Sequence, residues 1–131
     1  MPSAVCRALI AALCLLLAAF FAFVGWNKAF ASLADLARYG AWTVFLPEWA
    51  GRVVGWSEIA LAAGLLSIFV PRRRAVARWS ALLLIANQIV AALVHLTHGE
   101  TAALPQNGVL IALLFAVAIF ARPNFARGAM P

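Results

Sequence analysis

Four long apolar runs constrain this chain more than any other feature of its sequence. They cover residues 8–26, 53–70, 79–96 and 104–121. Each run holds about 18 residues, which in an α-helix extend roughly 27 Å, close to the hydrocarbon thickness of a bilayer. Exposed strands would leave their backbone groups without hydrogen-bond partners in lipid. The sequence therefore predicts an all-α integral membrane four-helix bundle, with residues 1–131 forming a single membrane domain.

The composition agrees with this class and excludes two others. Hydrophobic residues make up 66% of the chain and charged residues 11%, whereas soluble domains have about 45–50% and about 25%. The net charge of +6 does not indicate a nucleic-acid partner, because the arginines flank the apolar runs and line no single polar face. The partner that the composition predicts is the lipid bilayer.

The basic residues predict the topology. If the chain crosses four times, seven of its ten Lys and Arg residues fall on one side: Arg7, the arginines of the link 71–78, Arg122 and Arg127. The positive-inside rule then places both termini and the Arg-rich link in the cytoplasm. The segment 29–51 and the loop around residues 98–106 would face outside.

The first run also allows a signal-peptide interpretation. Ala29-Phe30-Ala31 fits an A-x-A cleavage site that follows a basic residue and an apolar run. However, the run of about 18 residues exceeds the about 7–15 of a typical signal peptide. We therefore expect a retained first helix.

The outer segment 29–51 is too apolar for a free loop. Phe30, Leu33 and Ala37 fall on one helical stripe opposite Asp35, which predicts a short amphipathic helix at the membrane interface. Three aromatic residues suit the same depth as anchors: Tyr39, Trp42 and Trp49. The simplest role for this segment is to cover the mouth of the bundle.

Glu58 is the only carboxylate inside an apolar run. Placing an ionisable group in the bilayer costs at least about 2.5–3.5 kcal/mol, so we expect a partner, either Lys28 or His95. Every predicted helix contributes a polar group to the outer half of the bundle. Gln88 and His95 are seven residues apart and share a helix face. The candidate ligand-binding set is Lys28, Glu58, Gln88, His95 and Asn107.

Two interpretations of this polar set remain open. The groups could satisfy one another through interhelical hydrogen bonds, each contributing about 0.6 kcal/mol. Alternatively, they could line an outward-facing pocket for a small polar or quinone-like ligand, with Glu58 as a proton acceptor. Glu58 favours the second interpretation, because a neutral Gln would join helices at a lower cost.

Metal and disulfide chemistry are not predicted. His95 and His98 are three residues apart and Glu100 follows, a set that could bind a transition metal. Gly99 is expected to end the helix before Glu100, so interfacial histidines are the simpler interpretation. Cys6 and Cys14 are about 12 Å apart along one helix, beyond disulfide reach.

No catalytic residue is predicted either. The serines have no base at a recognisable spacing, and no phosphate-binding loop is present. We therefore do not expect the isolated chain to be an enzyme. Gly51 and Gly55 form a G-x-x-x-G motif, which permits close packing either within the bundle or between two copies in a homodimer.

Several short motifs together resemble the DoxX-like family of small four-helix membrane proteins. Phe23-Val24-Gly25-Trp26-Asn27-Lys28 is similar to the family's G-x-x-K signature, and Gly55-Trp56-Ser57-Glu58 with Ala63-Gly64-Leu65-Leu66 resembles its G-x-x-E and G-x-L-L stretch. The order is completed by Leu46-Pro47, His95-Leu96, Gly99-Glu100 and Pro105-Gln106-Asn107.

This resemblance implies a protein of the bacterial inner membrane. Some relatives are small membrane subunits of thiosulfate–quinone oxidoreductase or redox-stress complexes, and others assist the assembly of membrane proteins. The resemblance thus implies that the chain is an accessory or membrane subunit with a membrane-protein partner. A quinone cofactor is implied by the resemblance alone. The alternatives are a proton-coupled small-molecule transporter and a purely structural or assembly factor.

Overall fold

The computed structural model describes residues 3–122, and these residues are almost entirely helical. The long helices are α1 (Ala4–Phe30), α3 (Glu48–Leu65), α4 (Arg74–Thr97) and α5 (Leu104–Phe120). The short elements are the helix α2 (Leu33–Arg38) and the 3-10 turns η1 (Trp42–Phe45), η2 (Leu66–Phe69), η3 (Pro71–Arg73) and η4 (Thr101–Ala103). No strand occurs between residues 3 and 122.

Four segments are long and apolar enough to cross a membrane: Ala4–Phe30, Glu48–Phe69, Pro71–Thr97 and Thr101–Phe120. This confirms the prediction of an all-α membrane protein with four helices. Three of the long helices, α1, α3 and α4, begin before the predicted runs 8–26, 53–70 and 79–96. The Ser3 hydroxyl accepts a hydrogen bond from the Cys6 amide at 3.0 Å and starts α1. Pro47 directly precedes α3, which begins five residues before the predicted span.

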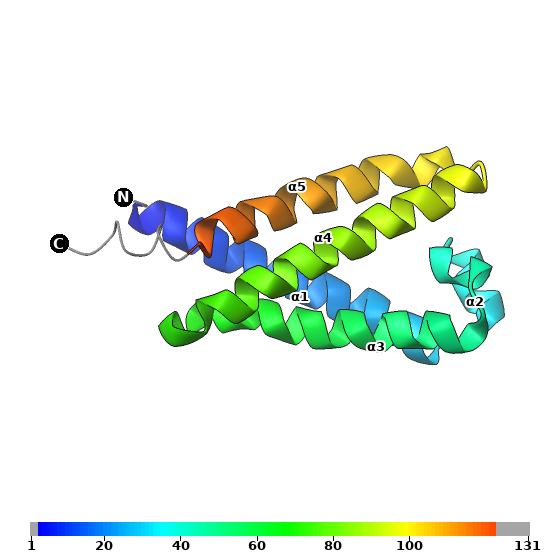
Figure 1. Cartoon of the computed structure of the whole chain (residues 1–131), viewed down its shortest axis with the longest axis horizontal. Helices are drawn as coiled ribbons and strands as arrows, with labels where there is room; N and C mark the ends of the chain where they lie inside the picture. Colours follow the sequence, from blue (N-terminus) through cyan, green and yellow to red (C-terminus); the bar gives the residue numbers. More distant parts are fainter. Residues whose placement is uncertain (1–2, 123–131) are drawn as a thin grey trace.

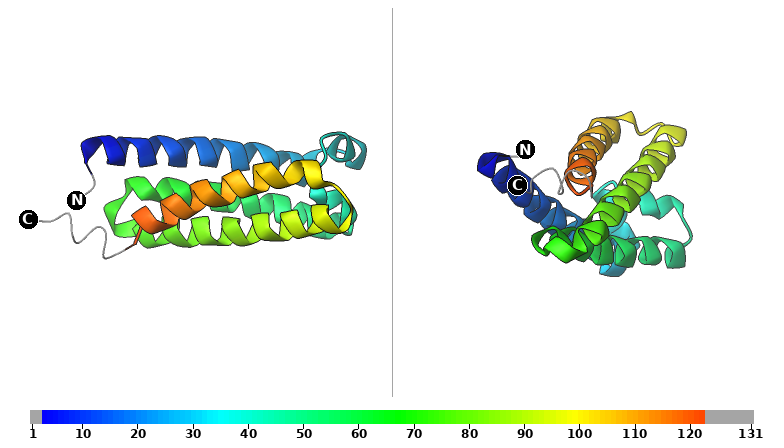
Figure 2. Two further views of the ribbon diagram at one scale, coloured as in Figure 1. Left: turned by 90° about the horizontal axis from the view of Figure 1, so that it is seen from above. Right: turned by 60° about the vertical axis from the view of Figure 1, so that its left-hand side comes forward.

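The two ends of the bundle carry different connections (Figures 1 and 2). The start of α1, the end of α5 and the link between α3 and α4 lie at one end. We call it the arginine end, because Arg72 and Arg73 lie in the link and Arg74 and Arg78 lie in the first turns of α4. The segment from α2 to η1 and the link between α4 and α5 lie at the other end, the α2 end.

The four helices form two closely packed pairs, α1 with α3 and α4 with α5. A Cβ atom at Gly55 would lie 2.5 Å from the Ala29 nitrogen and 2.7 Å from the Gly25 oxygen, so only glycine allows α1 and α3 to approach so closely. The other glycine of the motif, Gly51, packs against Thr43 of η1. The G-x-x-x-G motif therefore serves packing inside the bundle.

The helix pairs separate toward the α2 end, where α2 and η1 lie between them (Figure 1). The predicted apolar stripe of Phe30, Leu33 and Ala37 is not confirmed as one helix face. Leu36 is the buried residue, at 2% exposure, whereas Leu33 is exposed and Phe30 belongs to α1. Phe30 instead packs beside Trp26 and Trp56 on the outside of the α1–α3 pair. The interfacial position of α2 stays a prediction.

Apolar packing is concentrated in the half of the bundle near the arginine end. One continuous core joins all four helices there, with Phe21, Leu65, Leu84 and Leu114 fully buried. In the α2 half the buried side chains include many polar ones: Lys28, Thr43, Glu58, Gln88, His95 and Asn107. This division positions the candidate site.

Candidate functional site

A buried ion pair joins α1 to α3. The Lys28 Nζ atom lies 2.7 Å from Glu58 Oε1, and Glu58 is 0% exposed. Asn87 of α4 donates a second hydrogen bond to the same carboxylate oxygen at 2.9 Å. The carboxylate thus connects three helices, and its cost of burial is offset by a charge and an amide.

The close approach of α1 and α3 places this pair. Gly25 lies opposite the Cβ atom of Glu58, and Lys28 is one turn further toward the α2 end. Helical side chains lean toward the N-terminus of their own helix, so the Lys28 side chain runs back to the level of Glu58. The G-x-x-K and G-x-x-E spacings therefore place one ion pair next to one helix crossing.

Arg52 secures the end of α1 above this pair. Its Nη1 atom donates to the carbonyl oxygens of Lys28, at 3.0 Å, and Ala31, at 2.6 Å. Its Nη2 atom lies 3.2 Å from Glu48 Oε1. The carbonyls at a helix C-terminus have no partner within the helix, and a guanidinium satisfies them well. Arg52 thereby fixes the residue that carries the buried ammonium.

A second polar group joins α4 to α5. Asn107 Nδ2 donates to Gln88 Oε1 at 2.8 Å, and both residues are buried. His95 lies two turns further along the same face of α4, as its spacing from Gln88 predicts. The His95 Nδ1 atom is 3.6 Å from Glu100 Oε1, which is too long for a hydrogen bond.

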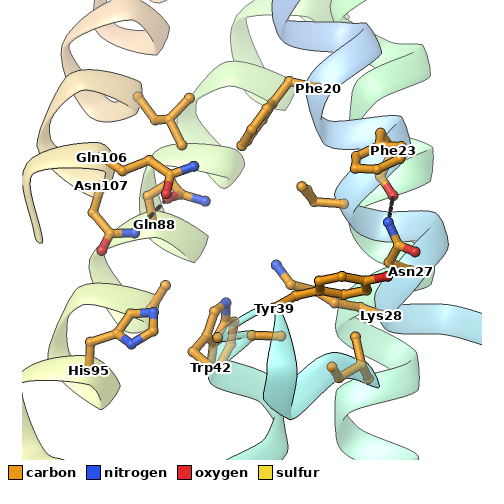
Figure 3. A pocket seen from close by; sticks show the side chains of 16 residues that line it. Phe20, Phe23, Asn27, Lys28, Tyr39, Trp42, Gln88, His95, Gln106 and Asn107 are labelled. Atoms are coloured by element: carbon orange, nitrogen blue, oxygen red, sulfur yellow. Dashed lines mark hydrogen bonds between the residues drawn. The ribbon is translucent and has the colours of Figure 1, made fainter. Parts of the chain in front are cut away.

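Between these two groups lies a cavity of about 400 Å³. Its walls come from α1, α2, η1, α4 and α5, and it includes Lys28, Trp42, Gln88, His95 and Asn107. Figure 3 shows His95, Gln88 and Asn107 on one side, Asn27 and Tyr39 on the other, and the indole nitrogen of Trp42 directed toward the space between them. The aromatic rings of Phe20 and Phe23 complete the wall.

Three buried polar atoms of the lining have no hydrogen-bond partner among residues 3–122: Trp42 Nε1, His95 Nδ1 and Asn107 Oδ1. Buried polar groups are nearly always satisfied, so such atoms gathered at one cavity indicate that something else completes them. Trp42 is only 5% exposed and its N–H can only donate. The cavity therefore offers at least one fixed donor to a ligand that carries an acceptor.

The charged groups at the cavity have partners within the protein. Lys28 forms an ion pair with Glu58, and its Nζ atom lies 5.7 Å from the centre of the Trp42 ring. The Glu100 carboxylate lies next to the His95 ring. An uncharged ligand would meet no unpaired charge from these residues. A charged ligand would have to displace one of these partners.

The structure brings four of the five candidate ligand-binding residues to one cavity wall, namely Lys28, Gln88, His95 and Asn107. Glu58 does not line the cavity, because Lys28 lies between them. Of the two partners expected for Glu58, the structure has Lys28 and not His95. Sequence analysis did not identify Asn87 as a hydrogen-bond donor to the Glu58 carboxylate, or Trp42 as a residue that lines the cavity. Asn87 could have been found, because its amide lies within an apolar run.

The histidine set expected to be interfacial is dispersed. His98 is exposed and stacks on Phe45, with ring centres 3.8 Å apart, and its Nδ1 atom faces the Val94 carbonyl oxygen at 2.8 Å. Within residues 3–122, no group of three or more His, Cys, Asp or Glu residues could hold a metal ion.

Comparison with known proteins identifies one relationship. The model of the DoxX-like family matches residues 12–117 of the chain, which include α3 and α4, most of α1 and α5, and every residue of the cavity described above. Comparisons with curated proteins and with solved structures give no match.

Proposed function

The chain belongs to the DoxX-like family, and from that premise we propose that it is a small accessory or membrane subunit whose cavity binds a quinone-like head group. The proposal includes a membrane-protein partner in a quinone-linked redox complex. It also includes a bacterial inner-membrane location, with the arginine end in the cytoplasm according to the positive-inside rule.

The observation that carries the ligand proposal is the Trp42 indole N–H. It is buried, is directed into the cavity and has no acceptor among the described residues. A quinone head group has carbonyl acceptors and no charge, so it matches both this donor and the paired charges of the wall. The volume of about 400 Å³ falls within the range of small-molecule sites, about 300–1,000 Å³.

The two alternatives have less support. A packing role accounts for the bond between Asn107 and Gln88, but it leaves Trp42 Nε1 unexplained. Proton-coupled transport requires a carboxylate that solvent can reach, whereas Glu58 is fully buried behind its partner.

The test is a calorimetric titration of the purified protein with a short-chain quinone analogue. Trp42→Phe keeps the aromatic ring and removes the donor, so it should weaken binding about tenfold, the effect of one lost hydrogen bond. Trp49→Phe is the matched control, because Trp49 is 72% exposed and does not line the cavity. Its affinity should equal that of the wild type.

Two results would contradict the proposal. One is a wild-type protein that does not bind the analogue. The other is an equal affinity in Trp42→Phe and Trp49→Phe, which would place the analogue outside the cavity.

A further inference from the structure

The arginine end of the bundle carries positive charge without any acidic side chain to balance it. Arg72, Arg73, Arg74 and Arg78 lie within seven residues at the start of the third span. The chain has four acidic residues, Asp35, Glu48, Glu58 and Glu100. They lie in α2, in α3 and in the link before η4. Each of these carboxylates is within ion-pair distance of a basic residue that lies outside the arginine end. The arginines therefore have no carboxylate side chain of their own.

Two of these arginines have side chains that contact, or are partly buried by, the rest of the bundle. Arg74 and Arg78 are one turn apart and so share a face of α4. The Arg74 guanidinium lies over the ring of Phe120, at the end of α5, 4.8 Å from its centre. The Arg78 Nε atom is buried and has no hydrogen-bond partner among the described residues. A guanidinium that is partly desolvated in this way requires an acceptor.

The surroundings of this pair match a lipid. Membrane topology places the end of a span at the level of the lipid head groups. Exposed apolar side chains that acyl chains could cover lie within five residues of the pair in the sequence: Phe69, Val70, Val76 and Trp79. A planar guanidinium forms paired hydrogen bonds with phosphate oxygens, and basic pockets at span ends bind anionic head groups.

We propose that Arg74 and Arg78 bind the phosphodiester of an anionic phospholipid in a discrete site between the start of α4 and the end of α5. This site is separate from the cavity at the α2 end and does not depend on the function proposed for that cavity. Arg72 and Arg73 are exposed, and their side chains have no hydrogen bond, ion pair or ring contact among the described residues, so they contribute only diffuse attraction.

The experiment is native mass spectrometry of the detergent-solubilised protein with added phosphatidylglycerol, phosphatidylcholine or inorganic phosphate. The wild type should retain phosphatidylglycerol but not phosphatidylcholine, and phosphate should neither bind nor displace the lipid. Arg74→Gln with Arg78→Gln should lower retention by at least about tenfold, since the loss of even one charge-assisted hydrogen bond has about that effect. The matched control, Arg72→Gln with Arg73→Gln, removes the same charge and should retain the lipid as the wild type does.

Three outcomes would overturn the proposal. Equal loss in both double variants would show diffuse attraction without a site. Equal retention of the two lipids would remove the requirement for an anion. Displacement of the lipid by inorganic phosphate would indicate a free-phosphate site.

Arg78→Lys covers the case in which the double variant does not fold. It keeps the charge but cannot present a planar pair of donors. Retention should fall severalfold in this variant, and unchanged retention would also overturn the proposal.

Discussion

The two halves of this bundle use the same four helices in different ways. Near the arginine end they converge on a continuous apolar core, in which Phe21, Leu84 and Leu114 are fully buried. Near the α2 end they separate around a cavity whose wall includes Lys28 and His95. A four-helix protein does not need a polar, open half for stability alone, because lipid-facing helices can pack apolar side chains along their whole length. The α2 half therefore carries the candidate function.

The largest expected effect comes from breaking the ion pair that separates the cavity from the α1–α3 crossing. Glu58→Ala leaves the Lys28 ammonium buried without its partner and should destabilise the protein by about 3–5 kcal/mol. Unfolding in detergent would measure this loss. The double variant Lys28→Met with Glu58→Leu removes both charges and should recover most of the stability. If the double variant is as unstable as Glu58→Ala, the loss of stability does not come from a buried charge that has lost its partner.

An intermediate effect compares the two halves directly on α4. Ala81 and Ala91 are both buried on α4, but Ala81 belongs to the apolar core and Ala91 lines the cavity. Ala81→Leu should overpack the core and cost about 1–3 kcal/mol. Ala91→Leu should cost much less, because its side chain enters free space. Equal losses in the two unfolding measurements would mean that the cavity is not open.

These differences show what the sequence could and could not predict. The four spans were predictable because hydropathy reports directly on contact with lipid. The polar set on the α2 side was predictable because the helix repeat fixes which residues share a face, as with Gln88 and His95. The helix ends were less predictable, because the Ser3 cap of α1 and the proline that precedes α3 both lie outside the apolar runs.

Contacts between helices were the hardest to predict. Lys28 and His95 were both reasonable partners for Glu58, and only the crossing at Gly25 and Gly55 selects Lys28. Trp42 was interpreted as an interfacial anchor, since aromatic residues at a span end usually have that role. Its direction depends on how η1 folds back over the bundle, which no local pattern specifies.

The smallest expected effect concerns the bond between α4 and α5. Gln88→Leu and Asn107→Leu each remove one partner of this bond, and a double-mutant cycle should give a coupling energy of about 0.6 kcal/mol. Equilibrium unfolding of the four proteins would measure it. A coupling of several kcal/mol would mean that this bond, rather than ligand binding, explains why the polar pair is present.

The most direct test of a ligand site at the α2 end is native mass spectrometry of the protein gently extracted from its own membrane. Glu58 variants suit this test poorly, because they break a buried ion pair that does not line the cavity. Ala91→Leu places a larger side chain in the cavity and leaves every polar residue in place. The account predicts a small molecule bound to the wild type and absent from Ala91→Leu. A wild type with the mass of the bare polypeptide, or a molecule retained equally by Ala91→Leu, would contradict it.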